Sequence, residues 1–119
     1  MLFRSGALVG EDGKAIGKAR KLTDSPRHSR YPALLPLGDR VLLVWSDDKD
    51  PAGRYEIFSK MLKSDLGPLG TEERITNGAG DSVFPVASFG PQGSVGVLFR
   101  DDRLGAPHVF FSGLVCQAK

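Results

Sequence analysis

Short runs of Val, Leu, Ile and aromatic residues alternate along the chain with clusters of Gly, Pro and Asp. The densest runs, 40–46 and 94–99, have the composition of strands that are buried on both faces. Two further segments, 30–35 and 83–89, begin beside a proline, which suits the start or the edge of a strand. The pattern therefore predicts short β-strands joined by tight turns.

The segment 54–63 is ambiguous, because its apolar residues also have the spacing of an amphipathic helix and no Gly or Pro interrupts it. A similar segment, 108–116, is rich in Val and Phe and contains Gly113, which disfavours a helix. Because equivalent segments should share one conformation, we predict a strand in both places.

An internal repeat of about 53 residues underlies this succession of strands. The matching segments are Lys21 to Asp24 with Arg74 to Asn77, Ser29 to Ala33 with Ser82 to Val86, Val41 to Asp48 with Val95 to Asp102 after a slip of one residue, and Ile57 to Ser59 with Phe110 to Ser112. Phe3 to Ser5 looks like an earlier copy of the last segment. Each repeat thus contains four strands, the fourth of which ends just before Leu22-Thr23 or Ile75-Thr76.

Four antiparallel strands in about 40–50 residues form one blade of a β-propeller. We therefore predict an all-β, single-domain chain of about two propeller-like blades: a partial blade at 1–28, a complete blade at 29–81, and a blade without its last strand at 82–119. Because propellers have four to eight blades, the chain is either a piece of a longer propeller or one unit of a ring. For a ring we expect a homo-oligomer, with a cyclic trimer as the first expectation, although the strand at 2–9 is then surplus.

Several short motifs recur in a fixed order. They are Ser-x-x-Pro at Ser29 to Pro32 and Ser82 to Pro85, Val-x-x-Val-Trp-x-Asp at Val41 to Asp47 with a second copy ending in Phe99-Arg100-Asp101, Glu-Ile-Phe at Glu56 to Phe58, and Asp-x-Gly-Pro-Leu-Gly at Asp65 to Gly70. This order resembles that of bacterial propeller repeats related to the sialidase-like, Asp-box (BNR) family. Of the Asp box itself only Asp65 and Gly67 match, since Lys63 and Gly70 stand where that family has Ser and Trp.

The resemblance implies a propeller fold and, for the enzymes of that family, sialidase activity. Those enzymes spread an arginine cluster, a Tyr nucleophile with a Glu partner and an Asp acid/base over all blades of one chain. No such catalytic motif falls on a position of this sequence, so no catalytic residue is carried over. Tyr31, which aligns with Phe84, is instead predicted to lie in the core. We expect a protein that is not an enzyme.

Two carboxylate pairs, Asp47-Asp48 and Asp101-Asp102, each follow a strand that is rich in apolar residues. Paired carboxylates could bind Ca²⁺ or act as acid and base. A turn role is favoured, because an Asp at a turn accepts hydrogen bonds from backbone N–H groups two residues on. If the loops bind a ligand, the residues that would contact it are Asp47, Asp48, Arg54, Asp101, Asp102 and Arg103.

Charge is distributed unevenly between the repeats. Residues 14–30 carry six basic side chains and one aspartate, whereas 67–83 carry three acidic side chains and one arginine. The basic group, Lys18, Arg20, Lys21 and Arg27, could bind an anion, could assist assembly, or could simply face solvent. The formal net charge of +2 is too balanced to imply a nucleic-acid partner.

The remaining candidate groups point to no metal or cofactor. His28 and His108 have no second ligand at a suitable spacing, and the single Cys116 excludes a disulfide framework. Trp45 is predicted to be a core residue rather than a sugar-stacking platform, because its counterpart in the repeat is Phe99. The longest apolar run has five residues and the N-terminus lacks a signal-peptide core, so we expect no membrane segment.

These observations predict a non-enzymatic propeller-type binding or scaffold module that acts as an assembled ring, with carbohydrate as a candidate ligand. One alternative is a fragment of an extracellular sialidase-like glycoside hydrolase, and another is a purely structural repeat segment. Compartment and ligand identity stay open at this point.

Overall fold

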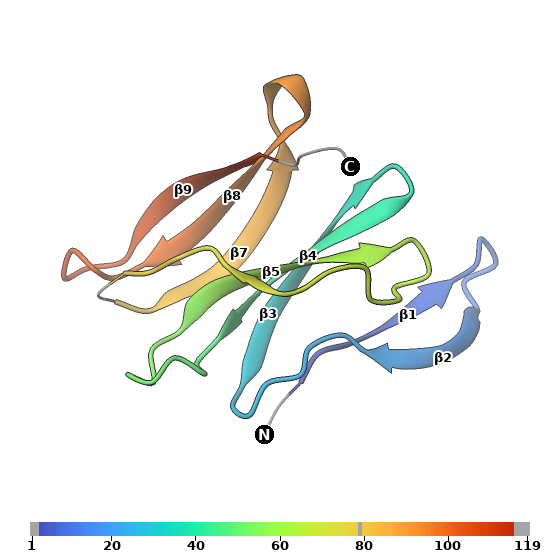
Figure 1. Ribbon diagram of the computed structural model, residues 1–119, viewed down its shortest axis with the longest axis horizontal. Coiled ribbons are helices and arrows are strands. Elements are labelled where there is room, and N and C mark those ends of the chain that lie inside the picture. The colour runs from blue at the N-terminus through green and yellow to red at the C-terminus, as the bar shows by residue number, and fades with distance from the viewer. Residues whose placement is uncertain (1–2, 79, 116–119) are drawn as a thin grey trace.

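The computed structural model describes residues 3–78 and 80–115. They form three antiparallel sheets that follow one another along the chain (Figure 1). The strands are β1 (Ser5–Val9), β2 (Ala15–Lys21), β3 (Ser29–Leu37), β4 (Arg40–Asp47), β5 (Glu56–Lys63), β6 (Glu73–Arg74), β7 (Ser82–Phe89), β8 (Ser94–Asp101) and β9 (His108–Val115). The all-β prediction is confirmed, including the strand at the ambiguous segment 54–63. Of the segment 108–116, only Cys116 lies outside the described residues.

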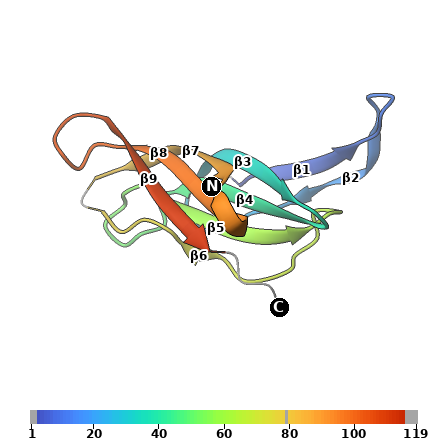
Figure 2. The same cartoon turned by 90° about the horizontal axis from the view of Figure 1, so that it is seen from above.

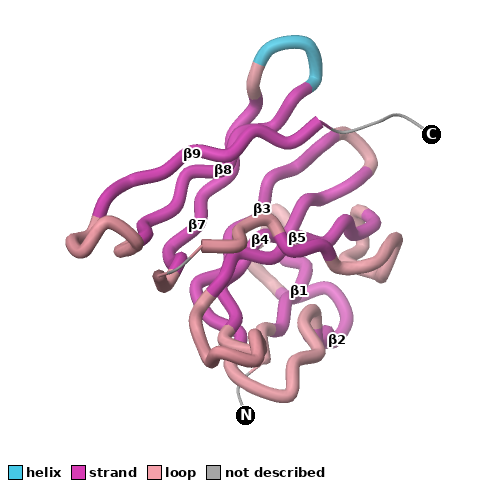
Figure 3. Tube along the Cα trace, turned by 60° about the vertical axis from the view of Figure 1, so that its left-hand side comes forward, coloured by secondary structure: helices cyan, strands magenta, loops and turns pink. Residues whose placement is uncertain are grey.

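We call β1–β2 the N-terminal hairpin, β3–β6 blade 1 and β7–β9 blade 2. Blade 1 is a meander in which each strand pairs with the next, and blade 2 repeats its first three strands. The two blades face each other, with β7 against β3 and β4, and the N-terminal hairpin lies beyond blade 1 (Figures 1 and 2). Figure 3 shows the tight turn at Pro91–Gly93 that joins β7 to β8. The described part of the chain holds no helix long and apolar enough to cross a membrane.

Matching hydrogen bonds occur at equivalent positions of the two repeats. The Thr23 hydroxyl accepts the backbone N–H of Arg4 at 2.9 Å, and 53 residues later the Thr76 hydroxyl accepts that of Ile57 at 2.8 Å. The turns that precede these threonines also correspond. In them Asp12 accepts the backbone N–H of Lys14, and Asp65 accepts that of Gly67.

The structure corrects the predicted register of the third strand by one residue. Phe58 lies opposite Trp45, and Phe110 lies opposite Phe99, with both ring pairs stacked at 6.0 Å. Phe58 therefore corresponds to Phe110 and not, as the sequence alignment suggested, to Phe111. The loop before the third strand is shorter in blade 2, which shifts the alignment.

Alternate residues of β4 enter two different hydrophobic clusters, as expected for a strand buried on both faces. Leu42 and Val44 join the cluster between the blades, where they meet Val95, Val97 and Phe99. The other face of β4 packs under the N-terminal hairpin. That second cluster consists of Leu22, Leu43, Trp45, Phe58, Leu62 and Leu66. Trp45 is completely buried, so the prediction that it is a core residue is confirmed.

Blade 2 presents one apolar face to solvent. Its centre is a row across three strands in which Val86 lies opposite Leu98 and Leu98 opposite Phe111. These side chains are 54, 42 and 68% exposed and border a hollow of about 460 Å³. The equivalent pair in blade 1, Ala33 opposite Val44, belongs to the cluster that blade 2 covers. The exposed face of blade 2 is thus the counterpart of a face that is buried in blade 1.

Candidate functional site

Asp47 ends β4 and is completely buried, with both carboxylate oxygens occupied. It accepts hydrogen bonds from the Ser25 hydroxyl at 2.8 Å and from the Ser29 hydroxyl at 2.7 Å. The Trp45 indole donates to it at 3.3 Å, and the backbone N–H of Lys49 at 3.0 Å. Asp47 therefore locks the turn after β4 to the segment before β3, which agrees with the turn role favoured by the sequence.

Asp48 is buried beside it and is bound by His28 from two directions. The backbone N–H of His28 donates to one oxygen at 2.8 Å, and its Nδ1 lies 3.1 Å from the other. Burial by itself would raise the pKa of Asp48. The two His28 hydrogen bonds and the charges of His28 and Arg27 outweigh it, so the pKa lies below its usual range.

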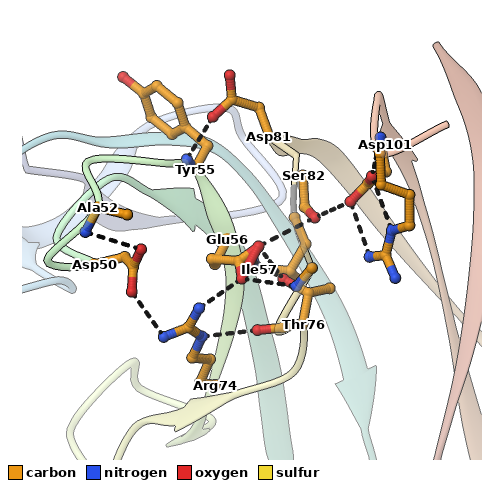
Figure 4. A network of polar contacts seen from close by, with 12 residues as sticks. Asp50, Ala52, Tyr55, Glu56, Ile57, Arg74, Thr76, Asp81, Ser82 and Asp101 are labelled. Carbon is orange, nitrogen blue, oxygen red and sulfur yellow. Dashed lines mark hydrogen bonds and ion pairs between the residues drawn. The ribbon is translucent and has the colours of Figure 1, made fainter. Parts of the chain in front are cut away.

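Asp101, the counterpart of Asp47, has a different set of partners (Figure 4). Ser82 donates its hydroxyl to this buried carboxylate, just as Ser29 does in blade 1. Arg103 forms two parallel bonds with it, from Nε to Oδ1 at 2.9 Å and from Nη2 to Oδ2 at 3.0 Å. The Arg103 hydrogen bond is the main reason that the pKa of Asp101 is lowered to about 2. Burial by itself would raise this pKa, and the Ser82 hydrogen bond lowers it further.

Glu56 is a completely buried carboxylate that the sequence analysis quoted in a motif but did not name as a candidate site residue. Arg74 donates to it at 2.6 Å and also pairs with Asp50 at 3.1 Å (Figure 4). The Thr76 hydroxyl donates to its other oxygen at 3.2 Å, and the Ser82 hydroxyl, whose proton goes to Asp101, lies 3.4 Å from that oxygen. The Glu56 hydrogen bond is the main reason that the pKa of Arg74 is raised. The backbone N–H of Gly78, in the segment that leads into blade 2, also donates to Glu56 at 3.2 Å, so Glu56 holds the connection between the two blades.

A small cleft of about 240 Å³ opens where the blades meet, and we call it the junction cleft. Its lining includes Tyr31, Tyr55, Asp81, Phe84, Arg100 and Asp102. Tyr31 and Phe84 come from equivalent positions in β3 and β7, and their ring centroids are 4.2 Å apart. Burial, followed by the charge of Asp48, raises the pKa of Tyr55, so its hydroxyl stays protonated at neutral pH.

The prediction that Tyr31 is a core residue was wrong. Tyr31 and Phe84 are 38 and 47% exposed and have φ angles of 55° and 57°. Each lies at a β-bulge, between Arg30 and Ala33 in β3 and between Val83 and Val86 in β7, which redirects its side chain outward. A left-handed conformation costs a residue with a side chain about 1–2 kcal/mol. Both repeats accept this cost at the same position.

The predicted ligand-contacting residues separate into two groups. Arg54, Asp102 and Arg103 line one open hollow of about 440 Å³ together with Asp81. Asp102 and Asp81 also line the junction cleft. Asp47, Asp48 and Asp101 are instead held by the contacts within the chain that are described above. The sequence missed the aromatic residues of the cleft, although their identical place in the two repeats was a usable signal.

The predicted basic group does not form one cluster. Lys18, Arg20 and Lys21 lie on β2, whereas Arg27 lies in the loop after it. Asp65 lies 4.0 Å from Arg20, Asp24 lies 3.1 Å from Lys21, and Asp48 lies 3.8 Å from Arg27. Lys18 is exposed beside Arg20 in a shallow hollow under the hairpin. Within residues 3–78 and 80–115, no three His, Cys, Asp or Glu side chains are grouped to hold a metal ion.

Comparison with known proteins identifies the fold and no family. No family model matches the sequence, and no curated protein matches it. The structure is similar to the crystal structure of endo-arabinase from Bacteroides thetaiotaomicron VPI-5482, with a TM-score of 0.67 and 16% sequence identity. The match covers 95% of this chain and 46% of that one, so the chain spans about half the length of the solved structure. At this identity the likeness concerns the fold alone, and it supports the assignment of propeller-like blades.

Proposed function

We propose that the chain is a non-enzymatic binding or scaffold module whose blades are completed by packing against copies of the same chain. The observation that carries this proposal is the exposed apolar row Val86, Leu98 and Phe111. In blade 1 the same position in the repeat is covered by a neighbouring blade. A blade that follows blade 2 in the same way would remove this row from water, which is the main driving force of such association.

The state of the buried carboxylates supports a role without catalysis. Asp47, Asp101 and Glu56 are all completely buried and accept hydrogen bonds from groups of this chain. A general acid or base must instead reach the proton that it transfers. These three carboxylates stabilise the turns after β4 and β8 and the junction between the blades.

Assembly into a ring imposes a rearrangement at the N-terminus. By their hydrogen bonds, β1 and β2 correspond to the third and fourth strands of a blade. In a ring, β2 of one copy would take the fourth place beside β9 of its neighbour. Because β1 already lies beside β2, β1 would have to leave that position.

The test is the mass in solution by size-exclusion chromatography with light scattering. We expect a closed assembly, with a trimer of this 12.8 kDa chain as the first expectation. A monodisperse monomer over the micromolar range would reject assembly of copies. Because β1 occupies the place beside β2, we also expect a chain that lacks residues 1–9 to assemble at a lower concentration than the full chain.

A second candidate is a segment of a glycoside hydrolase, and it is favoured by one observation, the structural likeness to an endo-arabinase. This candidate includes the sialidase-like alternative suggested by the sequence motifs. Release of reducing ends from arabinan, or turnover of a fluorogenic sialoside, would support it. Activity of the chain by itself on either substrate would overturn the non-enzymatic proposal.

A further inference from the structure

We propose that the junction cleft binds a neutral oligosaccharide, with one sugar ring stacked on the Tyr31–Phe84 pair. This inference rests on the binding half of the proposed function and is independent of whether the chain forms a ring. The cleft lies between the blades and is formed by residues of this chain alone.

The aromatic side chains supply a platform for the apolar face of a sugar. The centroids of Tyr31 and Phe84 are 4.2 Å apart at an interplanar angle of 48°, so the two rings form a tilted pair. Both side chains are more than one third exposed although they are large and aromatic. The bulge that holds them in a left-handed conformation in both repeats prevents them from turning into the core.

Polar groups surround this platform at fixed positions. One oxygen of Asp81 accepts the backbone N–H of Tyr55 at 2.8 Å, and one oxygen of Asp102 accepts the backbone N–H of Asp81 at 2.7 Å. These bonds orient the two carboxylates and leave each with further acceptor capacity. Arg100 lies over the Phe84 ring at 5.7 Å and contributes donors. Such a combination of apolar surface and a few oriented polar groups is typical of small-molecule sites.

The charges of the lining select among possible ligands. Two carboxylates, Asp81 and Asp102, and one guanidinium, Arg100, line the cleft, while Arg54 and Arg103 share the adjoining hollow with the same two carboxylates. Because Arg103 is paired with Asp101, these charges nearly balance, and no excess of positive charge attracts sialic acid, uronic acids or phosphates. Hydroxyl groups, by contrast, can donate to the carboxylates and accept from the arginine. The lining therefore favours an uncharged glycan.

The experiment is calorimetric titration of the full chain with hexasaccharides of glucose, xylose and arabinose, with sialyllactose and hexagalacturonate as anionic probes. We expect at least one neutral hexasaccharide to bind. Tyr31→Ala and Phe84→Ala should each weaken that binding tenfold or more, whereas Tyr31→Phe should keep most of it. Asp102→Asn retains the acceptor for the Asp81 backbone and should also weaken binding.

Matched controls lie elsewhere on the surface. Phe3→Ala removes an aromatic ring that is 49% exposed, and Asp24→Asn removes an exposed carboxylate, and neither should change affinity. Circular dichroism checks that every variant folds. Failure of all neutral hexasaccharides at millimolar concentration, equal or tighter binding of the anionic probes, or binding unchanged by Tyr31→Ala and Phe84→Ala would each overturn the proposal. Light scattering on the same samples reports assembly separately, so loss of the site and loss of the scaffold role are distinguishable.

Discussion

Arg103 holds the buried carboxylate of Asp101 through two parallel hydrogen bonds of 2.9 and 3.0 Å. The two residues are separated by one position, so the pair closes the turn that leaves β8. In blade 1 the equivalent position is Lys49, whose backbone N–H binds Asp47 and whose side chain instead pairs with Glu72. The two repeats thus share a backbone contact and differ in the ion pair added to it.

This pair makes folding stability dependent on pH at the acid end. The pKa of Asp101 is lowered to about 2 in the folded chain, so its contribution is complete above the unfolded value near 4 and is lost as the pH falls through 2. We expect Asp101→Asn to cost on the order of 2 kcal/mol at pH 7, with a difference from the parent chain that shrinks between pH 4 and 2. Urea denaturation at pH 7, 4 and 2.5 measures it. Asp24→Asn, at an exposed site, should show no such convergence.

Substitution of the two repeated threonines tests the internal repeat energetically. Thr23→Val and Thr76→Val each leave a backbone N–H, that of Arg4 or Ile57, without its acceptor. We expect a loss of about 1–2 kcal/mol for Thr23→Val. Thr76→Val should cost more, because Thr76 also donates to Glu56. Equal losses in thermal or urea denaturation would contradict a role for the Glu56 contact.

Loss of Arg74 should weaken the junction between the blades. Arg74→Ala leaves Glu56 fully buried without its ion pair, and we expect a cost of about 2–4 kcal/mol, reduced from a fully buried pair because Arg74 is one third exposed. Arg40→Ala is the matched control, since its partner Asp39 is almost fully exposed, and it should cost less than about 1 kcal/mol. Similar losses in the two variants would show that Glu56 finds another partner.

The equivalent residues Val44 and Leu98 give a direct measure of which blade face is covered. Val44 is fully buried, so Val44→Ala should cost about 1–3 kcal/mol in any state of assembly. Leu98 is 42% exposed in the single chain, so Leu98→Ala should cost less than about 1 kcal/mol at low concentration. If copies assemble over this face, Leu98→Ala should raise the concentration needed for association, as measured by light scattering. An unchanged association curve would place the contact elsewhere.

The strand pattern was predictable from the sequence because it depends on local composition and on repetition. Dense apolar runs indicated β4 and β8, and the Gly in the last segment resolved the ambiguity of β5. The role of Asp47 was also predictable, since an aspartate after a strand is typical of a turn. Two copies of one pattern carry more information than either does alone.

The junction cleft and the Glu56 contacts were not predictable, because they depend on geometry between segments far apart in sequence. Tyr31 is a large aromatic residue of a type common in cores, and only the bulge in β3 turns its side chain outward. Glu56 is the first residue of β5, and nothing near it in sequence shows that Arg74 reaches it. The predicted register of the third strand was wrong by one residue, because the loop before this strand differs in length between the blades and only the strand pairing shows the difference.

The burial of Trp45 has an optical consequence. It is the one tryptophan of the chain, it stacks on Phe58, and it lies with Leu22, which follows β2, on the face of blade 1 away from blade 2. Its emission should be that of an indole shielded from water, and a red shift should accompany exposure of this face when the N-terminal hairpin moves away. The fluorophore therefore reports on exposure of this face when β1 or the whole hairpin moves, while the junction cleft lies outside its immediate surroundings.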